Sequence, residues 1–338
     1  MSTKKDQVQS LLQQLPDDCS IEDIQFYDMS DSVQHFTSQQ RLIKELFAKE
    51  DWLKLCERQP NHPAVNKYQI CQQMIEQGGI IKMPENSDIL AELTSILLDN
   101  YIFAKISGGN TTHFSLGDFA NYGDLKVKQN IESQLKNGKT DAFSSLMTEL
   151  SFGAWFLNKQ GFQLTATEDE GLADFKIDIY GHPIPIAVEC KHIDTSTNES
   201  RYQLHIKKAN KQIKNWKTTL STQEMYGIVV IDVSSRFLNI RNNFGKIKNE
   251  LTELASKIQR LIRKEYSSVS GVLLMCDSFQ MSNKPGEQSH TDFSFARNGL
   301  FIRHLKPIQP LPDTLAQSFE SYWGYRTGYR VKWKDREV

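Results

Sequence analysis

The sequence predicts an α/β protein in which helices flank a mixed β-sheet, with a mostly helical segment in front. Three observations lead to this fold class. From residue 141 onward, β-rich runs alternate with amphipathic helical patterns, which is typical of a sheet covered by helices. Residues 1–140 show mainly helical periodicity. Hydrophobic residues make up 39% of the 338-residue chain, which is enough for a buried core. We therefore expect a helical N-terminal domain over 1–140 and an α/β domain over 141–338.

The bulk composition narrows the class of protein. The formal net charge is −1, from 40 basic and 41 acidic residues, so any electrostatic binding has to come from a local patch. No segment has the pattern of a signal peptide or the roughly 18 apolar residues of a membrane span, which predicts a cytoplasmic protein without membrane contact. The 5 cysteines form no CxxC pair, and reduced thiols are expected.

The first 140 residues contain several residues that are typical of helix starts and ends. Thr37 is a potential N-cap before a run of helically spaced apolar residues. Pro63 suits the first turn of a second helix, and the Gly78-Gly79 pair suits its end. The small, polar residues 107–124 predict a loop close to the domain boundary. Helices are expected near 37–55, 62–79 and 87–105.

The second domain has a regular alternation of elements. Asn298-Gly299 lies between two β-rich runs and predicts a type I′ hairpin turn. Strands are expected near 162–167, 174–180, 184–191, 227–233 and 270–276, and helices near 141–161, 201–217, 245–265 and 313–325.

Two of the expected strands, 174–180 and 184–191, carry charges on one face only. Because side chains alternate along a strand, odd and even positions lie on opposite faces. The apolar face holds Phe175, Ile177, Ile179, Ile184, Ile186, Val188 and Cys190. The charged face holds Asp174, Lys176, Asp178, Ala187, Glu189 and Lys191.

A turn at Gly181 and His182 would join these strands and set their register. Asp174 would then lie opposite Glu189, where the Cβ atoms of paired residues are about 4.5–5.5 Å apart. A bulge, which the two prolines that follow the turn would promote, would shift the register by one residue.

Two carboxylates at this separation repel each other unless a cation lies between them. Lys191 supplies one positive charge against two negative ones. A hard divalent ion such as Mg²⁺, which prefers oxygen ligands, would complete the balance. Asp178 is expected to be a surface acid unless the register slips.

The helix expected at 201–217 is basic and contains no acidic residue. Lys207, Lys211 and Lys214 have the i, i+4, i+7 spacing of one helical face, and Lys208 lies beside them. Such a stripe could follow a phosphate backbone, although a solvated helix face has the same composition.

These residues resemble the PD-(D/E)xK nuclease superfamily, in which a helical acid precedes an Asp on one hairpin strand and a Glu-x-Lys on the next. The matching residues are Glu149, Asp174, Glu189 and Lys191. Ala173 stands where the usual Pro precedes the Asp. The resemblance covers about residues 141–235 and implies a restriction-endonuclease-like fold.

The resemblance also implies roles for these residues. Asp174 and Glu189, with the backbone carbonyl of Cys190, would hold Mg²⁺ or Mn²⁺, and Glu149 would add a further carboxylate. Lys191 would orient or help deprotonate the attacking water and offset charge at the phosphate. Gln212 occupies the position of a helix-borne Gln found near the site in many members. Asp141, or one of the loop acids Glu168, Asp169 and Glu170, could serve in place of Glu149.

We therefore expect a metal-dependent endonuclease that hydrolyses nucleic-acid phosphodiesters. The resemblance favours DNA over RNA and a role in restriction or phage defence. One site per chain would favour a homodimer for cutting both strands, and the N-terminal domain could bind a protein partner. Two alternatives remain open: a non-catalytic nucleic-acid-binding or assembly module on the same fold, and an interaction protein whose helical half carries the function.

Overall fold

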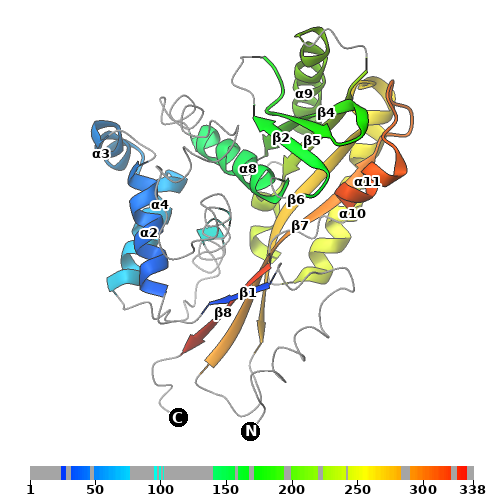
Figure 1. The fold of residues 1–338 in the computed structure, drawn as a ribbon. Helices are drawn as coiled ribbons and strands as arrows, with labels where there is room; N and C mark the ends of the chain where they lie inside the picture. Colours follow the sequence, from blue (N-terminus) through cyan, green and yellow to red (C-terminus); the bar gives the residue numbers. More distant parts are fainter. Residues whose placement is uncertain are drawn as a thin grey trace.

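The computed structural model has an α/β architecture built on one mixed sheet (Figure 1). The description covers residues 24–27, 32–45, 49–76, 95–96, 99, 102, 140–156, 159–166, 171–193, 199–219, 224–240, 243–282, 290–320 and 326–332. The third expected helix, the Gly78-Gly79 pair and the 107–124 loop lie largely or wholly outside these residues.

The sheet has eight strands in the order β1-β8-β7-β6-β5-β4-β3-β2. The pairs β4–β5, β5–β6 and β1–β8 are parallel, and the other neighbouring pairs are antiparallel. The strands are β1 (Ile24–Tyr27), β2 (Phe162–Ala166), β3 (Phe175–Ile179), β4 (His182–His192), β5 (Tyr226–Asp232), β6 (Gly271–Ser282), β7 (His290–Arg303) and β8 (Arg326–Lys332).

Helices cover both faces of the sheet (Figure 1). One face carries α8 (Thr140–Phe156) and α11 (Asp313–Glu320), and α2 (Ser32–Glu45), α3 (Lys49–Arg58) and α4 (Pro63–Glu76) join the same core. The other face carries α9 (Glu199–Thr219), the 3-10 helix η3 (Ser234–Ile240) and α10 (Phe244–Glu265). The helices α9 and α10 connect the parallel strands β4, β5 and β6, as crossover connections require.

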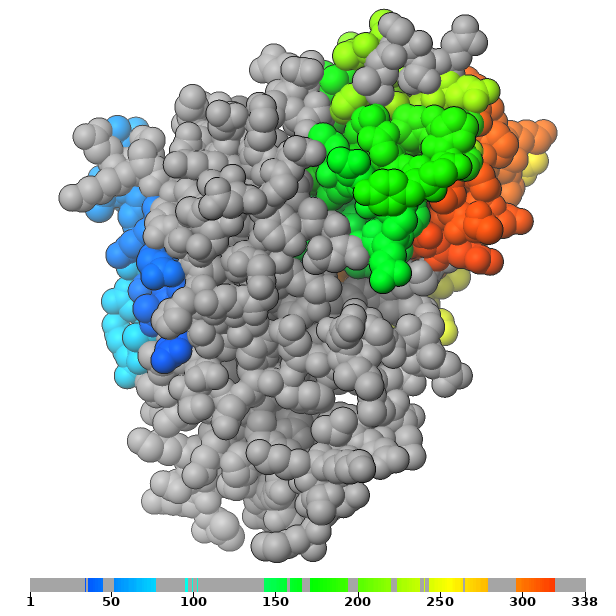
Figure 2. Space-filling model, in the orientation of Figure 1, coloured from blue at the N-terminus to red at the C-terminus, as the bar shows by residue number. Residues whose placement is uncertain are grey.

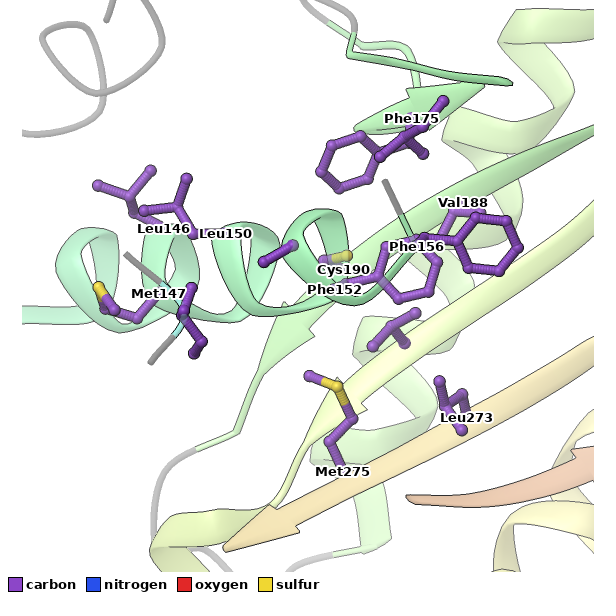
Figure 3. Close-up of a cluster of buried hydrophobic side chains, with 14 of the residues drawn as sticks. Leu146, Met147, Leu150, Phe152, Phe156, Phe175, Val188, Cys190, Leu273 and Met275 are labelled. Carbon is purple, nitrogen blue, oxygen red and sulfur yellow. The ribbon is translucent and has the colours of Figure 1, made fainter. Parts of the chain in front are cut away.

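Aromatic packing joins α8 to the sheet. Phe152 and Phe156 are fully buried and stack at a centroid distance of 5.5 Å, and Phe156 also stacks on Phe319 of α11 at 5.5 Å. Figure 3 shows the side chains of α8 gathered with those of the strands: Leu146, Met147, Leu150, Phe152 and Phe156 with Phe175, Val188, Cys190, Leu273 and Met275.

The region of strands β2 to β4 and the helix α11 are also neighbours at the molecular surface (Figure 2). In Figure 2 the green residues of the β2–β4 region adjoin the orange-red residues around α11 on one face of the molecule. No helix among the described residues is long and apolar enough to cross a membrane.

The helices of the N-terminal region differ in detail from their expected positions. The helix α4 begins at Pro63, as expected. The expected 37–55 helix is instead two helices, and the first begins at Ser32, so Thr37 lies inside it and is not its N-cap. The sequence also gave no sign of β1, which pairs in parallel with β8 at one edge of the sheet. The hydrophobic core continues from α2 to α4 into α8 without a break at residue 140.

The hairpin turn expected at Asn298-Gly299 is wrong. These residues lie within the continuous strand β7 and pair with Cys276 and Met275 of β6. Asn298 is buried, and its side-chain amide donates to the hydroxyl of Ser278 at 2.7 Å. Asn-Gly predicts a turn because both residues tolerate positive φ, but here the side chain of Asn298 bonds across the strands instead.

A glycine on β5 fixes how closely α9 approaches the sheet. A Cβ added at Gly227 would lie 2.3 Å from the carbonyl oxygen of Ser268 and 2.9 Å from a methyl group of Ile213 on α9. Neither the backbone nor the buried helix can move aside without repacking. Gly227 is therefore required for the close packing of α9.

We expect Gly227→Ala to lower the free energy of unfolding by about 1–3 kcal/mol, because overpacking a core costs this amount. Urea denaturation followed by circular dichroism would measure it. Gly245→Ala is the control, since a Cβ there would meet its nearest neighbour, Asn243, at 3.7 Å. Equal stability of Gly227→Ala and the parent protein would contradict the packing argument.

Candidate active site

The β3–β4 hairpin has the register that brings the two acids together. Phe175 pairs with Val188, so Asp174 and Glu189 are the next residues along the two chains. The turn is formed by Tyr180 and Gly181, one residue earlier than expected, and Gly181 has φ +77°.

A bulge on β4 compensates for this shift of the turn. The register changes between Ile177, which pairs with Ile186, and Ile179, which pairs with His182. The strand β4 therefore contains two extra residues here, in the segment that includes Pro183 and Pro185. The early turn and the bulge cancel each other, which restores the expected register at Asp174 and Glu189.

Asp174 lies just before β3 and caps the ladder between β3 and β4. Its Oδ2 atom accepts a hydrogen bond from the backbone N–H of Cys190, at 2.6 Å. A carboxylate that accepts from a backbone N–H of the next strand is held in one orientation. Asp174 is thus fixed beside β4 by the backbone of the residue that follows Glu189.

Glu189 is fully buried, although it is a charged residue type. The ammonium of Lys191, two residues along β4, forms an ion pair with its Oε1 atom. The Oε2 atom is buried and has no hydrogen bond of ordinary geometry to the described residues, although the Gln212 amide is close enough to act on this carboxyl group. A buried carboxylate is energetically costly unless donors or a cation satisfy its oxygens.

The electrostatics of the three groups follow from burial and mutual charge. Burial, and then the charge of Asp174, raises the pKa of Glu189, while Lys191 and the Gln212 amide act to lower it. Burial also raises the pKa of Asp174, against the effects of Lys191 and the Cys190 N–H. The pKa of Lys191 is raised, because Glu189 and Asp174 outweigh the opposing effect of burial. The two acids therefore resist ionising together, as expected for like charges in a small volume.

Glu149 lies on α8, partly buried, near the same strand. Burial, followed by the charges of Asp174, Glu149 and Glu189, raises the pKa of the Cys190 thiol. All three acids therefore lie within electrostatic reach of Cys190. Cys190 itself is buried against α8, so its thiol belongs to the core and only its backbone faces the acids. The alternative acids Glu168, Asp169 and Glu170, and the side chain of Asp141, lie outside the description.

Asp178 is not part of the cluster. Its carboxylate pairs with Lys176 at 2.7 Å on the same face of β3. Both side chains are partly exposed, so this is a surface ion pair.

The helix α9 presents its lysines to solvent. Its apolar residues other than Leu204 are buried against the sheet, which leaves the opposite face exposed. The exposed side chains include four of the five expected nucleic-acid contacts, the fifth being Gln212: Lys207, Lys208, Lys211 and Lys214. Gln212 is placed differently, because it is half-buried and donates from Nε2 to the carbonyl of Leu172 at 3.1 Å.

A buried polar network that the sequence did not indicate lies at the ends of β4 and β5. Asp232 accepts hydrogen bonds from the N–H of Ser234 at 2.9 Å and from the hydroxyl of Thr148 at 3.3 Å. The His192 ring lies 3.8 Å from the same carboxylate. Although burial acts to raise it, the pKa of Asp232 is lowered by His192, Arg297 and Ser234. The sequence pattern does not indicate this network, because Asp232 is simply the last residue of an otherwise apolar strand.

The residues present fit a divalent cation. Mg²⁺ is commonly held by one or two carboxylates together with water. Asp174 and Glu189 supply such a pair, since the charge of Asp174 acts on Glu189 and both carboxyl groups have raised pKa values. No group of three or more His, Cys, Asp or Glu side chains forms a complete ligand set within the described ranges. A metal would therefore take its other oxygens from the backbone and solvent.

Comparison with models of known protein families finds no family that matches this chain, and comparison with curated proteins finds no match either.

The raised pKa of Glu189 predicts how stability depends on pH. A carboxyl whose folded pKa lies above its unfolded value stabilises the fold at low pH, and this contribution is lost as pH rises through the folded pKa. Glu189→Gln cannot ionise. We expect the variant to be more stable than the parent at pH 8, by roughly 1 kcal/mol or more, and no more stable below the ordinary glutamate pKa of about 4.3.

Urea denaturation in the presence of a chelator, at several pH values, would measure this difference. The chelator matters because a bound cation would stabilise the parent protein. A variant that is less stable than the parent at pH 8 would show that Glu189 is stabilised as a carboxylate and not strained by its surroundings.

Proposed function

We propose that this chain is a metal-dependent nuclease of the PD-(D/E)xK type that hydrolyses nucleic-acid phosphodiesters. The observation that carries the proposal is the convergence of Asp174, Glu189 and Lys191 beside the hairpin, where the two acids and the ammonium interact with one another. A sheet with helices on both faces, in which α8 precedes the hairpin and α9 follows it, agrees with a restriction-endonuclease-like core.

Asp174 and Glu189 would hold the cation, Mg²⁺ or Mn²⁺, with the backbone carbonyl of Cys190, and Glu149 would contribute a further carboxylate. A bound divalent ion supplies a water of lowered pKa and stabilises negative charge at the phosphorus. The hydrogen bond from the Cys190 N–H keeps Asp174 aimed at β4 before any ion arrives. This arrangement reduces the reorganisation needed on binding.

Lys191 would supply positive charge at the scissile phosphate. Its raised pKa keeps the ammonium protonated at neutral pH, so it donates hydrogen bonds and offsets charge. A fixed donor aimed at developing negative charge lowers the barrier most in a site that excludes water. By this reasoning Lys191 orients water and phosphate, and does not accept the proton.

The exposed lysines of α9 would hold the nucleic-acid backbone. Lys207, Lys208, Lys211 and Lys214 all lie on the solvent side of the helix that follows β4. In a chain with a net charge of −1, such a cluster gives a local positive surface. We favour DNA as the substrate and restriction or phage defence as the setting, following the family resemblance. A homodimer would cut both strands, and residues 1–140 would bind a protein partner.

Asp174→Ala should abolish Mg²⁺-dependent cleavage, by about a thousandfold or more, because it removes one of the two acids that would hold the ion. Incubation with plasmid, linear DNA, single-stranded DNA and RNA, with and without Mg²⁺, would measure the activity of the parent and the variant.

The matched control is Asp178→Ala, which removes an acid from the same face of β3 that is already paired with Lys176. Its activity should equal that of the parent. Native-rate cleavage by Asp174→Ala would reject the assignment. Nucleic-acid binding without cleavage by the parent would favour the non-catalytic module.

The lysine cluster predicts a change in salt dependence. Replacing Lys207 and Lys211 by Ala should weaken nucleic-acid binding and reduce the slope of log K against log salt by about 2, since each phosphate contact contributes roughly 0.9. Fluorescence anisotropy with a labelled duplex at several salt concentrations would test this. The control pair Lys248→Ala and Lys257→Ala removes two exposed lysines from α10. An unchanged slope in the α9 variant would mean that this face is only solvated.

A further inference from the structure

Three side chains of α9 hold the backbone that leads into Asp174. Each donates to one of three consecutive carbonyl groups in a segment that belongs to no strand. We name these side chains, Gln212, Asn215 and Trp216, the α9 clamp. The hydrogen bonds run from Asn215 to Gly171 at 2.7 Å, from Gln212 to Leu172 at 3.1 Å and from Trp216 to Ala173 at 2.9 Å.

Among the described residues, no strand pairs with this segment. It precedes β3, so its backbone does not take part in the ladder with β4. Gly171 opens it with φ +85°, a conformation that L side chains rarely adopt. The clamp therefore replaces the hydrogen bonds that a strand would have provided, at the point where Asp174 must be fixed.

Burial makes the Trp216 contact the strongest part of the clamp. Trp216 is largely buried and Ala173 is completely buried. Loss of the indole N–H would leave the carbonyl of Ala173 without this donor in an apolar environment, and such groups are costly. Asn215 is more exposed, so its contact can be removed with less effect on the core.

We propose that Asn215 and Trp216 are positioning residues: their hydrogen bonds fix the backbone at 171 and 173 and so hold Asp174 where it can share a divalent cation with Glu189. The catalytic part of this inference rests on the proposed function. The placement of Asp174 is a property of the metal-free protein and can be measured without it.

The clamp and the lysine cluster make different contacts, and Trp216 is buried away from the lysines, whereas Asn215 lies one helical turn after Lys211. The clamp side chains point to the 171–173 backbone, whereas Lys211 and Lys214, which directly precede Gln212 and Asn215, are exposed. Trp216→Phe should therefore spare nucleic-acid binding. Changes in the lysines should spare the placement of Asp174.

The test uses the full chain with Asn215→Ala or Trp216→Phe. The first removes a side-chain donor near the surface, and the second keeps an aromatic ring while removing the N–H. The probe of Asp174 is the backbone amide of Cys190, which donates to its carboxylate. Hydrogen exchange of this amide, followed by NMR without metal, reports whether Asp174 stays in place.

We expect Cys190 amide exchange to become about tenfold faster in each variant, relative to amides of β5, since a hydrogen bond to a charged group contributes on this scale. Mn²⁺ affinity, measured by calorimetry, should fall about tenfold. The kcat should fall in both variants, and in Trp216→Phe the KM for nucleic acid and its binding in a chelator should stay unchanged.

The control is Ile213→Val, which loosens the same helix without touching the clamp. Ile213 is fully buried, so this change costs overall stability. Equal acceleration of the Cys190 amide in Ile213→Val, or no acceleration in either clamp variant, would overturn the proposal.

The two proposals fail in different ways. A parent protein that neither binds Mn²⁺ nor cleaves nucleic acid would reject the nuclease, and the Cys190 amide would then decide alone whether the clamp holds Asp174. A parent that binds Mn²⁺ and cleaves, with clamp variants that match it in Mn²⁺ affinity and kcat, would reject the positioning role and leave the nuclease intact.

Discussion

The confinement of two carboxylates and one ammonium beside β4 is the constraint on which the rest of the structure depends. Asp174, Glu189 and Lys191 lie together in a volume largely closed to solvent, and the raised pKa values of the two acids show that ionising both is unfavourable. Isolated buried charges cost several kcal/mol each, so the surrounding fold has to supply that stability. It does so with a central strand, β5, in which every residue is buried, and with apolar layers on both faces.

The helices on both faces of the sheet help to fix the positions of Asp174, Glu189 and Lys191. On one side, α8 packs its aromatic residues against Phe175 and Val188, which places the hairpin strands. On the other side, α9 lies so close to β5 that Gly227 cannot accept a side chain, and its polar residues reach the backbone before Asp174. The cluster is thus fixed by packing on one face and by hydrogen bonds on the other. Such rigid support is what a preorganised site requires.

Most of the α/β portion could be predicted from the sequence, because hydrophobic periodicity alone defines α8 to α10 and strands β2 to β6. The predicted register at Asp174 is correct, but the predicted turn is not. The turn comes one residue early, and a bulge at the prolines restores the pairing. Patterns within one segment cannot reveal long-range pairing. This is why β1, β8 and the continuity of β7 through Asn298 were missed.

The candidate site likewise has one part that the sequence predicts and one part that it does not. The pairing of Asp174 with Glu189 and Lys191 follows from alternation along two adjacent strands, which is a local signal. The contacts of Gln212, Asn215 and Trp216 with residues 171–173 bridge about 40 positions of sequence, and amide side chains on a helix give no indication of such partners. Asp232 was likewise hidden, since its partners Thr148 and His192 come from separate elements.

The parallel pairing of β1 with β8 also constrains when the molecule can be completed during its synthesis. Residues 24–27 have no strand to pair with until residues 326–332 have left the ribosome. Closing a loop of this size is entropically slow, and the edge of β7 remains open in the meantime. The hairpin and its crossover helices can form earlier, from contiguous chain. Assembly should therefore proceed from the hairpin outward, and an unfinished chain would expose an unpaired strand edge that favours association with other chains.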